Sequence, residues 1–214
     1  MLSRRVRRAA TAAVPVAVPT AMRVLFPRLA QRFGTRVGYL AGFGIYYAGC
    51  VGLTLTLAEP AELRRLLNAP GRLPSPRSLS TAALLVPPLG GFFTQVIPHW
   101  RDADPVVIAS ALSIASVNAT AEELLWHGLP LSVFGDDARR GWLWPGLGFT
   151  AWHLAPLSVR PAPHKGQFLL GAGIIGLGFG WVAQRTSSLR LVLACHIATD
   201  AMGLRAAAFW LGRG

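Results

Sequence analysis

Six ionisable side chains lie inside the apolar part of the sequence, and their types are those that activate water for hydrolysis. Leaving aside two arginines near the ends of the last apolar run, they are Glu122, Glu123, His127, His153, His196 and Asp200. A charged side chain within a bilayer costs a few kcal/mol even on the mildest insertion scales, so it is paired and usually functional. A carboxylate that takes a proton, together with imidazoles that hold or polarise a water molecule, can activate water for hydrolysis.

The spacing of these residues groups them on three helices. Residues four apart share one face of a helix, and the pairs and rows with this spacing are Glu123–His127, Phe149–His153, His196–Asp200 and Asn118–Glu122–Trp126. Polar groups within lipid must face one another or a water-filled cavity. We therefore expect one polar pocket between three helices, with Asn118 hydrogen-bonded to Glu122 and Phe149 packed beside His153.

Each of these residues also has a simpler explanation. The two glutamates could mark an ordinary helix end at the lipid–water boundary. His196 with Asp200 could be a structural hydrogen-bonded pair, and His127 with Glu123 an ion pair within one helix. A lone histidine such as His153 is by default a satisfied core residue. The hydrolytic interpretation depends on the whole set.

The composition is that of a membrane protein. Of the 214 residues, 52% are hydrophobic and 14% are charged, against roughly 25% charged in soluble domains. A bilayer-spanning helix needs about 20 apolar residues. Uncharged stretches close to that length occupy 37–58, 79–98, 105–121, 141–158, 166–184 and, apart from Asp200, 191–204 with an extension to Trp210. We predict an all-α, polytopic membrane bundle of about six spans, with a range of five to eight, in a bacterial cell membrane.

The segment that carries the glutamates is longer than one span requires. Residues 105–134 are apolar enough to continue past Glu122 and Glu123 as a helix. The pattern predicts that this helix breaks at Gly128 and Pro130.

Basic residues gather at the N-terminus. Residues 1–36 hold eight arginines and no acid, and Pro15 and Pro19 interrupt the apolar stretch 9–22, which makes it a poor signal peptide. We expect 1–36 to be a cytoplasmic basic arm that binds anionic lipids, followed by a transmembrane domain over 37–214. The arginines of the next loop argue for the opposite orientation.

The net charge of +12 does not indicate a nucleic-acid partner. All but one of the 21 basic residues are arginines, and they lie between apolar segments and at the N-terminus. This distribution fits lipid headgroups better than a DNA-binding face.

The glycines at 171–176 formally match a dinucleotide fingerprint, but that fingerprint needs a preceding strand. Gly176 and Gly180 are better explained by close helix packing.

Three motifs in order resemble a known family. The sequence reads Glu122-Glu123-Leu124-Leu125-Trp126-His127-Gly128, then Phe149-Thr150-Ala151-Trp152-His153, then His196-Ile197-Ala198-Thr199-Asp200. The pattern is similar to the Glu-Glu-x-x-x-Arg, Phe-x-x-x-His and His-x-x-x-Asn/Asp motifs of the CPBP intramembrane proteases, which include CAAX-prenyl endopeptidases and bacterial Abi-type relatives. The resemblance covers roughly residues 80–205.

The resemblance implies an intramembrane endopeptidase that acts on membrane-embedded or lipidated proteins or peptides. By position, Glu122 resembles the general base, and His153 helps to hold and polarise the water. His196 resembles the donor to the tetrahedral oxyanion. Asp200 occupies the Asn/Asp position, and Glu123 resembles a supporting carboxylate.

Two positions depart from the family pattern. His127 stands where the family has arginine, which is a permanent cation with a forked donor. Asp200, when ionised, only accepts hydrogen bonds, so we expect it to orient His196 rather than to donate.

The alternative to an endopeptidase is a catalytically silent membrane protein that uses the same pocket for binding or immunity. A proton-coupled transporter would predict an internal repeat, and none is visible.

No cofactor is expected. If a metal binds, the resemblance and the residue types give Glu122, His153 and His196 as ligands of zinc. There is no His-Glu-x-x-His helix, and the resemblance points to a metal-free glutamate mechanism.

Overall fold

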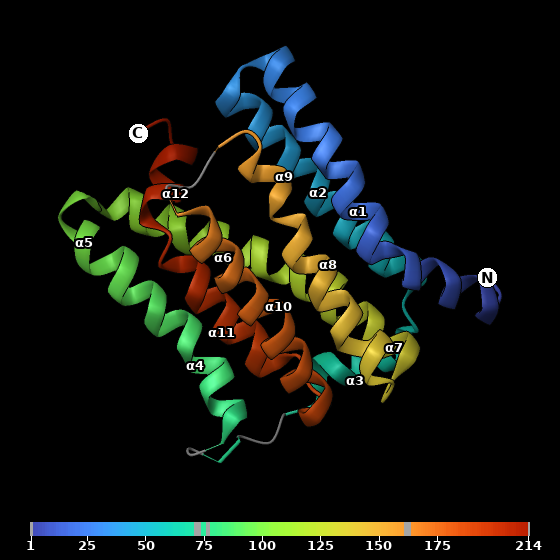
Figure 1. Cartoon of the computed structure of the whole chain (residues 1–214). Helices are drawn as coiled ribbons and strands as arrows, with labels where there is room; N and C mark the ends of the chain where they lie inside the picture. Colours follow the sequence, from blue (N-terminus) through green and yellow to red (C-terminus); the bar gives the residue numbers. More distant parts are fainter. Residues whose placement is uncertain (1, 71–73, 76–77, 161–163, 214) are drawn as a thin grey trace.

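The computed structural model describes residues 2–70, 74–75, 78–160 and 164–213, and the described part is helical, without strands. The sequence predicts short connections between its uncharged stretches, and two of them, 59–78 and 159–165, lie partly outside the described residues. In chain order the elements (Figure 1) are α1 (Arg4–Phe33), α2 (Thr35–Leu57), α3 (Pro60–Asn68), α4 (Leu79–Gly91), η1 (Phe92–Val96), α5 (Ile97–His99), η2 (Trp100–Asp102), α6 (Pro105–Glu123), η3 (Leu124–Gly128), α7 (Leu129–Phe134), η4 (Arg139–Leu143), α8 (Trp144–Trp152), α9 (Leu154–Leu157), α10 (Lys165–Thr186), α11 (Arg190–Ala201) and α12 (Leu204–Trp210).

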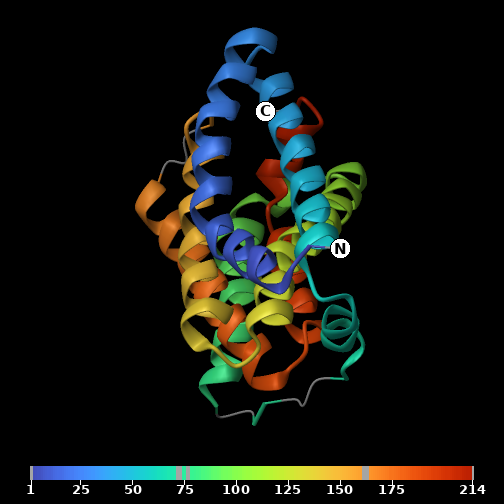
Figure 2. The same ribbon diagram turned by 90° about the vertical axis from the view of Figure 1, so that its right-hand side faces the viewer.

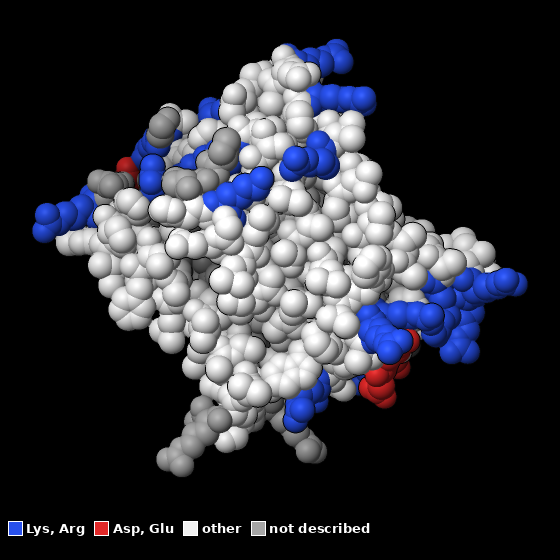
Figure 3. Space-filling model, in the orientation of Figure 1, with Lys and Arg blue, Asp and Glu red and all other residues white. Residues whose placement is uncertain are grey.

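The predicted membrane bundle is confirmed. Among the described residues five helices are long and apolar enough to cross a bilayer, namely Arg4–Phe33, Thr35–Leu57, Leu79–His99, Pro105–Phe134 and Lys165–Thr186. The number rises to six if α11 and α12, which are bent by 71°, count as one span. Large apolar side chains such as Leu79 and Leu170 are exposed on the outside of the bundle. In Figure 3 the basic side chains gather toward the ends of the molecule and leave an uncharged surface between them, as a bilayer requires.

The expected span at 141–158 is not one helix. Residues 139–157 form the π-helical turn η4, then α8 and α9, with a break at His153. Pro156 has no N–H to donate to the carbonyl of Trp152, four residues earlier, so the regular ladder cannot continue there. The break places His153 at a joint between two short helices.

Residues 4–33 form a long helix that packs on the bundle. The helix α1 runs through Pro15, Pro19 and Pro27, turns at Gly34 (φ +80°), and returns as α2. Figure 2 shows the two as an antiparallel hairpin. A Cβ at Gly42 would lie 2.9 Å from the ring of Phe26, so glycine permits this close approach.

The basic end of α1 is tied to the rest of the chain. Arg7 pairs with Glu59, and the guanidinium of Arg8 lies 5.0 Å from the ring centroid of Phe134. Residues 4–33 thus contact the bundle, although the boundary at residue 36 and the binding of anionic lipids stay predictions.

The segment that carries the glutamates is helical from Pro105 to Phe134. It begins at Asp104, whose Oδ1 accepts from the backbone N–H groups of Val106 (2.8 Å) and Val107 (2.9 Å). The expected break at Gly128 and Pro130 is wrong, because the helix widens there instead. In η3 the N–H of Leu129 bonds to the carbonyl of Leu124, five residues back. Pro130 has no backbone N–H, and it follows η3 at the point where the helix returns to the ordinary α-helical hydrogen-bond pattern.

The glycines of α10 serve packing, as expected. A Cβ at Gly176 would lie 2.7 Å from the ring of Phe149, and a Cβ at Gly180 would lie 2.9 Å from the ring of His127. Both glycines are buried within the continuous helix Lys165–Thr186. Their absent side chains let α10 approach the segments that carry the site residues.

Candidate active site

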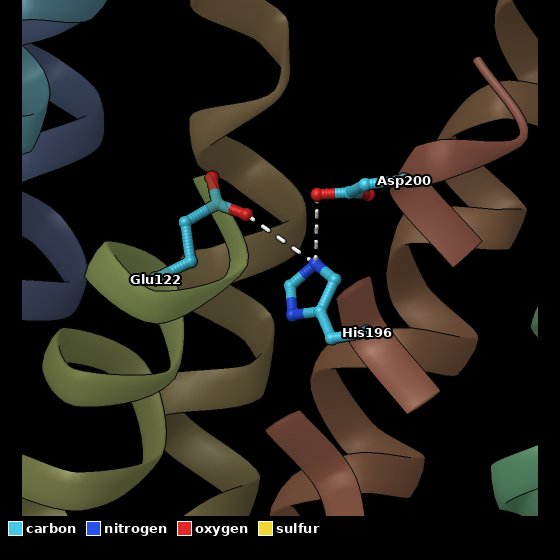
Figure 4. A group of neighbouring side chains, drawn as sticks. All are labelled: Glu122, His196 and Asp200. Carbon is cyan, nitrogen blue, oxygen red and sulfur yellow. Dashed lines mark ion pairs between the residues drawn. The ribbon is translucent and has the colours of Figure 1, made fainter. Parts of the chain in front are cut away.

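The packing of α11 against α6 brings three ionisable groups together (Figure 4). Nε2 of His196 lies 3.6 Å from Oε2 of Glu122 and 3.7 Å from Oδ2 of Asp200. Glu122 and His196 are 2% and 1% exposed, whereas the side chain of Asp200 is 24% exposed. The cluster is therefore closed on the side of Glu122 and open on the side of Asp200.

The two oxygens of the Glu122 carboxylate have different surroundings. Oε1 accepts from the hydroxyl of Tyr46 at 3.1 Å and from Nε1 of Trp152 at 2.8 Å. Oε2 accepts from Nδ2 of Asn118 at 3.1 Å and faces His196. The carboxylate is thus held by three neutral donors, and one oxygen faces the polar cluster.

The neighbouring carboxylate, Glu123, binds two imidazoles. Its Oε2 lies 2.7 Å from Nδ1 of His127 and its Oε1 lies 2.8 Å from Nδ1 of His196. Successive residues of a helix point about 100° apart, so Glu122 and Glu123 approach His196 from different sides. One imidazole ring thereby contacts both glutamates, each through a different nitrogen.

His127 is held between two acceptors. Its Nδ1 faces the carboxylate of Glu123, and its Nε2 lies 3.0 Å from the carbonyl oxygen of Gly176. The residue is fully buried. Because both partners accept hydrogen bonds, both are satisfied only when both ring nitrogens carry hydrogen. At the arginine position of the family pattern, this chain thus places a ring that can donate in two directions.

Asn118 links the two acidic residues of the cluster. Its Nδ2 donates to Oδ2 of Asp200 at 2.7 Å as well as to Glu122. The amide oxygen of Asn118 is buried and has no hydrogen-bond partner among the described residues. Asp200 thus accepts from Asn118 and lies beside His196, in keeping with the acceptor role expected for it.

His153 lies apart from this cluster. Its Nδ1 is 2.8 Å from the carbonyl oxygen of Phe149, so Nδ1 carries the hydrogen and Nε2 is left as an acceptor. Within the described chain no hydrogen bond joins His153 to Glu122 or His196. Phe149 packs edge-on against both rings, with centroid distances of 4.7 Å to His153 and 5.9 Å to His196.

The donor set that could hold a metal differs from the expected one. The structure groups Glu122, His196 and Asp200, whose ligand atoms lie within 4.8 Å of one another, and leaves His153 outside. Two carboxylates and an imidazole, with the second ring nitrogen on Glu123, suit a divalent cation in composition. The same two carboxylate oxygens, however, already accept from the amide of Asn118.

Two residues of the site were not found from the sequence. Tyr46 lies on α2, 76 residues before Glu122, and no local pattern connects the two. Trp152 precedes His153 inside the second motif, but the motif gives no reason to expect its indole on Glu122. A buried carboxylate needs donors, so a search of the other spans for Tyr and Trp would have been the available signal.

Comparison with known proteins supports the resemblance found in the motifs. Residues 104–202 match the family described as type II CAAX prenyl endopeptidase Rce1-like, which is part of the CPBP group. This segment holds all six ionisable residues of the apolar spans, and Tyr46 lies outside it. No significant match was found among curated proteins or among solved structures.

Proposed function

We propose that this multi-pass membrane protein is a CAAX-type intramembrane endopeptidase in which Glu122 is the general base. The observation that carries the proposal is the placement of Glu122 Oε2 beside His196 Nε2 and Asp200, within the segment that matches the endopeptidase family. Oε1 is occupied by two donors, so Oε2 is the oxygen available to water.

The proposed reaction is hydrolysis of a peptide bond. Oε2 of Glu122 takes a proton from water as the water oxygen bonds to the scissile carbonyl carbon. An N–H at Nε2 of His196 donates to the oxyanion that forms, and Asp200 and Glu123 hold the ring in place. Glu122 then gives the proton to the leaving amine as the C–N bond breaks. Nε2 of His153, as an acceptor, can bind a hydrogen of the same water.

The proposed substrate is a membrane-embedded or lipidated protein, and its apolar chain has a place to lie. Two adjoining hollows, of about 340 and 510 Å³, run between α2, α6 and α12 and share Ile114 and Trp210 in their linings. Tyr47 and Val117, each one residue from a member of the site, line the first hollow. The groove is lined mainly by apolar side chains, and Glu122, His196 and Asp200 are not among its lining residues.

Filling this groove should weaken substrate binding without unfolding the protein. Gly44 lines the first hollow, and a Cβ added there meets nothing within 4 Å. Gly44→Leu should therefore raise KM and leave kcat and the unfolding midpoint near those of the native chain. Gly49→Leu is the matched control, because Gly49 is equally uncrowded and is not among the lining residues. Equal KM values for the two variants would contradict the placement of the substrate.

A catalytically silent binding protein is the second candidate. The observation that favours it is that no hydrogen bond joins His153 to Glu122 among the described residues, together with the closure of the site around Glu122. The two donor directions of His127 favour the enzyme, because they supply what the arginine of the family pattern would supply to Glu123. The location of the protein in a bacterial cell membrane stays a prediction.

The test is cleavage of a library of membrane-anchored reporter peptides by purified protein in lipid. Native protein is compared with Glu122→Gln, each with and without a chelator. Cleavage that is lost in Glu122→Gln and insensitive to the chelator supports the metal-free mechanism that we propose. Cleavage that chelator abolishes and added zinc restores would assign a metal to Glu122, His196 and Asp200. No cleavage by the native chain, with cleavage gained in His127→Arg, would establish the silent alternative.

A further inference from the structure

A chain of three hydrogen-bonding groups leads from η3 through α2 to the candidate base on α6. Nε1 of Trp126 donates to the hydroxyl oxygen of Tyr46 at 2.7 Å, and this hydroxyl donates to Oε1 of Glu122 at 3.1 Å. Nε1 of Trp152 donates to the same Oε1 at 2.8 Å. All four side chains are at most 2% exposed.

The direction of this chain is determined by its members. An indole N–H only donates, so Trp126 occupies a lone pair of the Tyr46 oxygen and cannot accept from it. The hydroxyl hydrogen of Tyr46 has two acceptors beside it, Oε1 of Glu122 and the sulfur of Cys50, and it is directed to Glu122 because thiol sulfur is only a weak acceptor. The ring of Tyr46 stacks on that of Trp152, with centroids 3.6 Å apart and planes 15° apart, which fixes both donors relative to each other.

We propose that Tyr46 is a positioning residue for the peptidase reaction, because with Trp152 it occupies Oε1 of Glu122 and leaves Oε2 to exchange the proton. The proposal rests on the proposed function of Glu122 as base. Oε1 already accepts one O–H bond, from Tyr46, and one N–H bond, from Trp152. A proton placed on Oε1 would compete with both donors, so protonation there would break both hydrogen bonds. A carboxylate turned by 180° would exchange its oxygens, and the two donors oppose that turn.

The proposal extends the site beyond the segment that matches the endopeptidase family. Tyr46 lies on α2, and α2 is held by its hairpin partner α1. The N-terminal hairpin is then part of the catalytic apparatus and not only a membrane anchor. Tyr46 touches neither substrate nor water in this arrangement and acts through Glu122.

Another residue of α2 offers a matched control. The hydroxyl of Thr54 is buried and has no hydrogen-bond partner among the described residues. Thr54→Val thus removes a buried hydroxyl from the same helix, keeps the shape of the side chain and breaks no bond. Tyr46→Phe keeps the stacked ring and removes one donor from Glu122.

The experiment measures kcat and KM for a cleaved reporter peptide with Tyr46→Phe, Thr54→Val and Glu122→Gln in lipid. Loss of one hydrogen bond to a charged group corresponds to a decrease of kcat of about 10- to 100-fold in Tyr46→Phe. KM should be unchanged, and the pH at which kcat is half-maximal on the acid side should rise, because the ionised carboxylate has lost a donor. Thr54→Val should match the native chain in kcat, in KM and in the pH dependence of kcat.

The outcomes separate this proposal from the proposed function. If Glu122→Gln abolishes cleavage and Tyr46→Phe behaves like Thr54→Val, the positioning role of Tyr46 is wrong and the role of Glu122 stands. If Glu122→Gln cleaves at the native rate, the proposed function itself is wrong. If Tyr46→Phe does not insert stably, Trp126→Phe takes its place, since it frees the Tyr46 hydroxyl to turn away without touching Glu122. An unchanged kcat in that folded variant would overturn the proposal.

Discussion

Adjacent glutamates in the site should respond very differently to the same substitution. Glu122→Gln should abolish cleavage and leave the protein almost as stable as the native chain. Glu123→Gln should destabilise it strongly. The reason is the kind of partner: Glu122 accepts from neutral donors on both oxygens, whereas each oxygen of Glu123 meets an imidazole.

The magnitudes follow from these bonds. In Glu122→Gln the amide oxygen keeps Tyr46 and Trp152, and the one hydrogen bond lost is that from Asn118, which costs about 1 kcal/mol; Nε2 of His196, at 3.6 Å, is too distant for a hydrogen bond. In Glu123→Gln the amide nitrogen faces a ring nitrogen that donates, and the buried imidazoles lose their carboxylate. Breaking one partner of a buried pair costs about 3–5 kcal/mol. The free energy of unfolding should therefore differ by at least about 2 kcal/mol between the two variants.

The assay has two parts. The free energy of unfolding is measured by denaturant titration in detergent micelles, and cleavage of a membrane-anchored reporter is measured in lipid. Two variants that are equally stable, or a Glu122→Gln variant that is the less stable of the two, would refute the assignment of neutral donors to Glu122 and of imidazoles to Glu123.

Two further predictions concern the supports of the site. Gly180→Ala should destabilise the protein by about 1–3 kcal/mol, because the new Cβ would lie 2.9 Å from the ring of His127, and Gly171→Ala, with nothing within 4 Å, should not; thermal unfolding of both variants checks this. At the start of α6 the backbone N–H of Val107 holds the pKa of Asp104 below its usual range. Asp104→Ala should therefore lower the unfolding midpoint near pH 7, and the difference should shrink as the pH falls below about 4, since a lowered pKa stabilises only where the carboxylate is ionised.

The membrane class and most of the spans could be predicted from the sequence, because runs of apolar residues report directly on the bilayer. The errors come from proline. The segment 141–158 looks like a span by composition, but Pro156 breaks it at His153. Pro15 and Pro19 look like breaks, but α1 runs through them. Packing against neighbouring helices decides between these cases, and composition does not report it.

The candidate site was predictable only in part. The spacing of four residues placed Glu123 against His127 and Asn118 against Glu122, because such contacts lie within one helix. The contact of His196 with both glutamates depends on how α6 and α11 pack, and that of Tyr46 on α2. His153 was expected to help hold and polarise the water; its Nδ1 lies on the carbonyl oxygen of Phe149, and its role on the water stays a prediction. The catalytic roles themselves stay predictions.

The two nitrogens of His196 should have separable tasks. Nδ1 binds Glu123, and Nε2 faces Glu122 and Asp200. The amide nitrogen of asparagine can replace Nδ1, and that of glutamine can replace Nε2. His196→Asn should therefore remain nearly as stable as the native chain and be inactive, because nothing is left to donate to the oxyanion.

His196→Gln should show the opposite behaviour. It leaves Glu123 without its second imidazole, so it should be less stable than His196→Asn by about 1–3 kcal/mol. It should also retain at least about tenfold more cleavage activity, since an amide N–H can reach the position of Nε2. Unfolding in micelles and cleavage in lipid are measured on both variants. If the more stable variant is also the more active one, a single nitrogen of His196 serves both structure and reaction, and the division of the ring between the two glutamates is wrong.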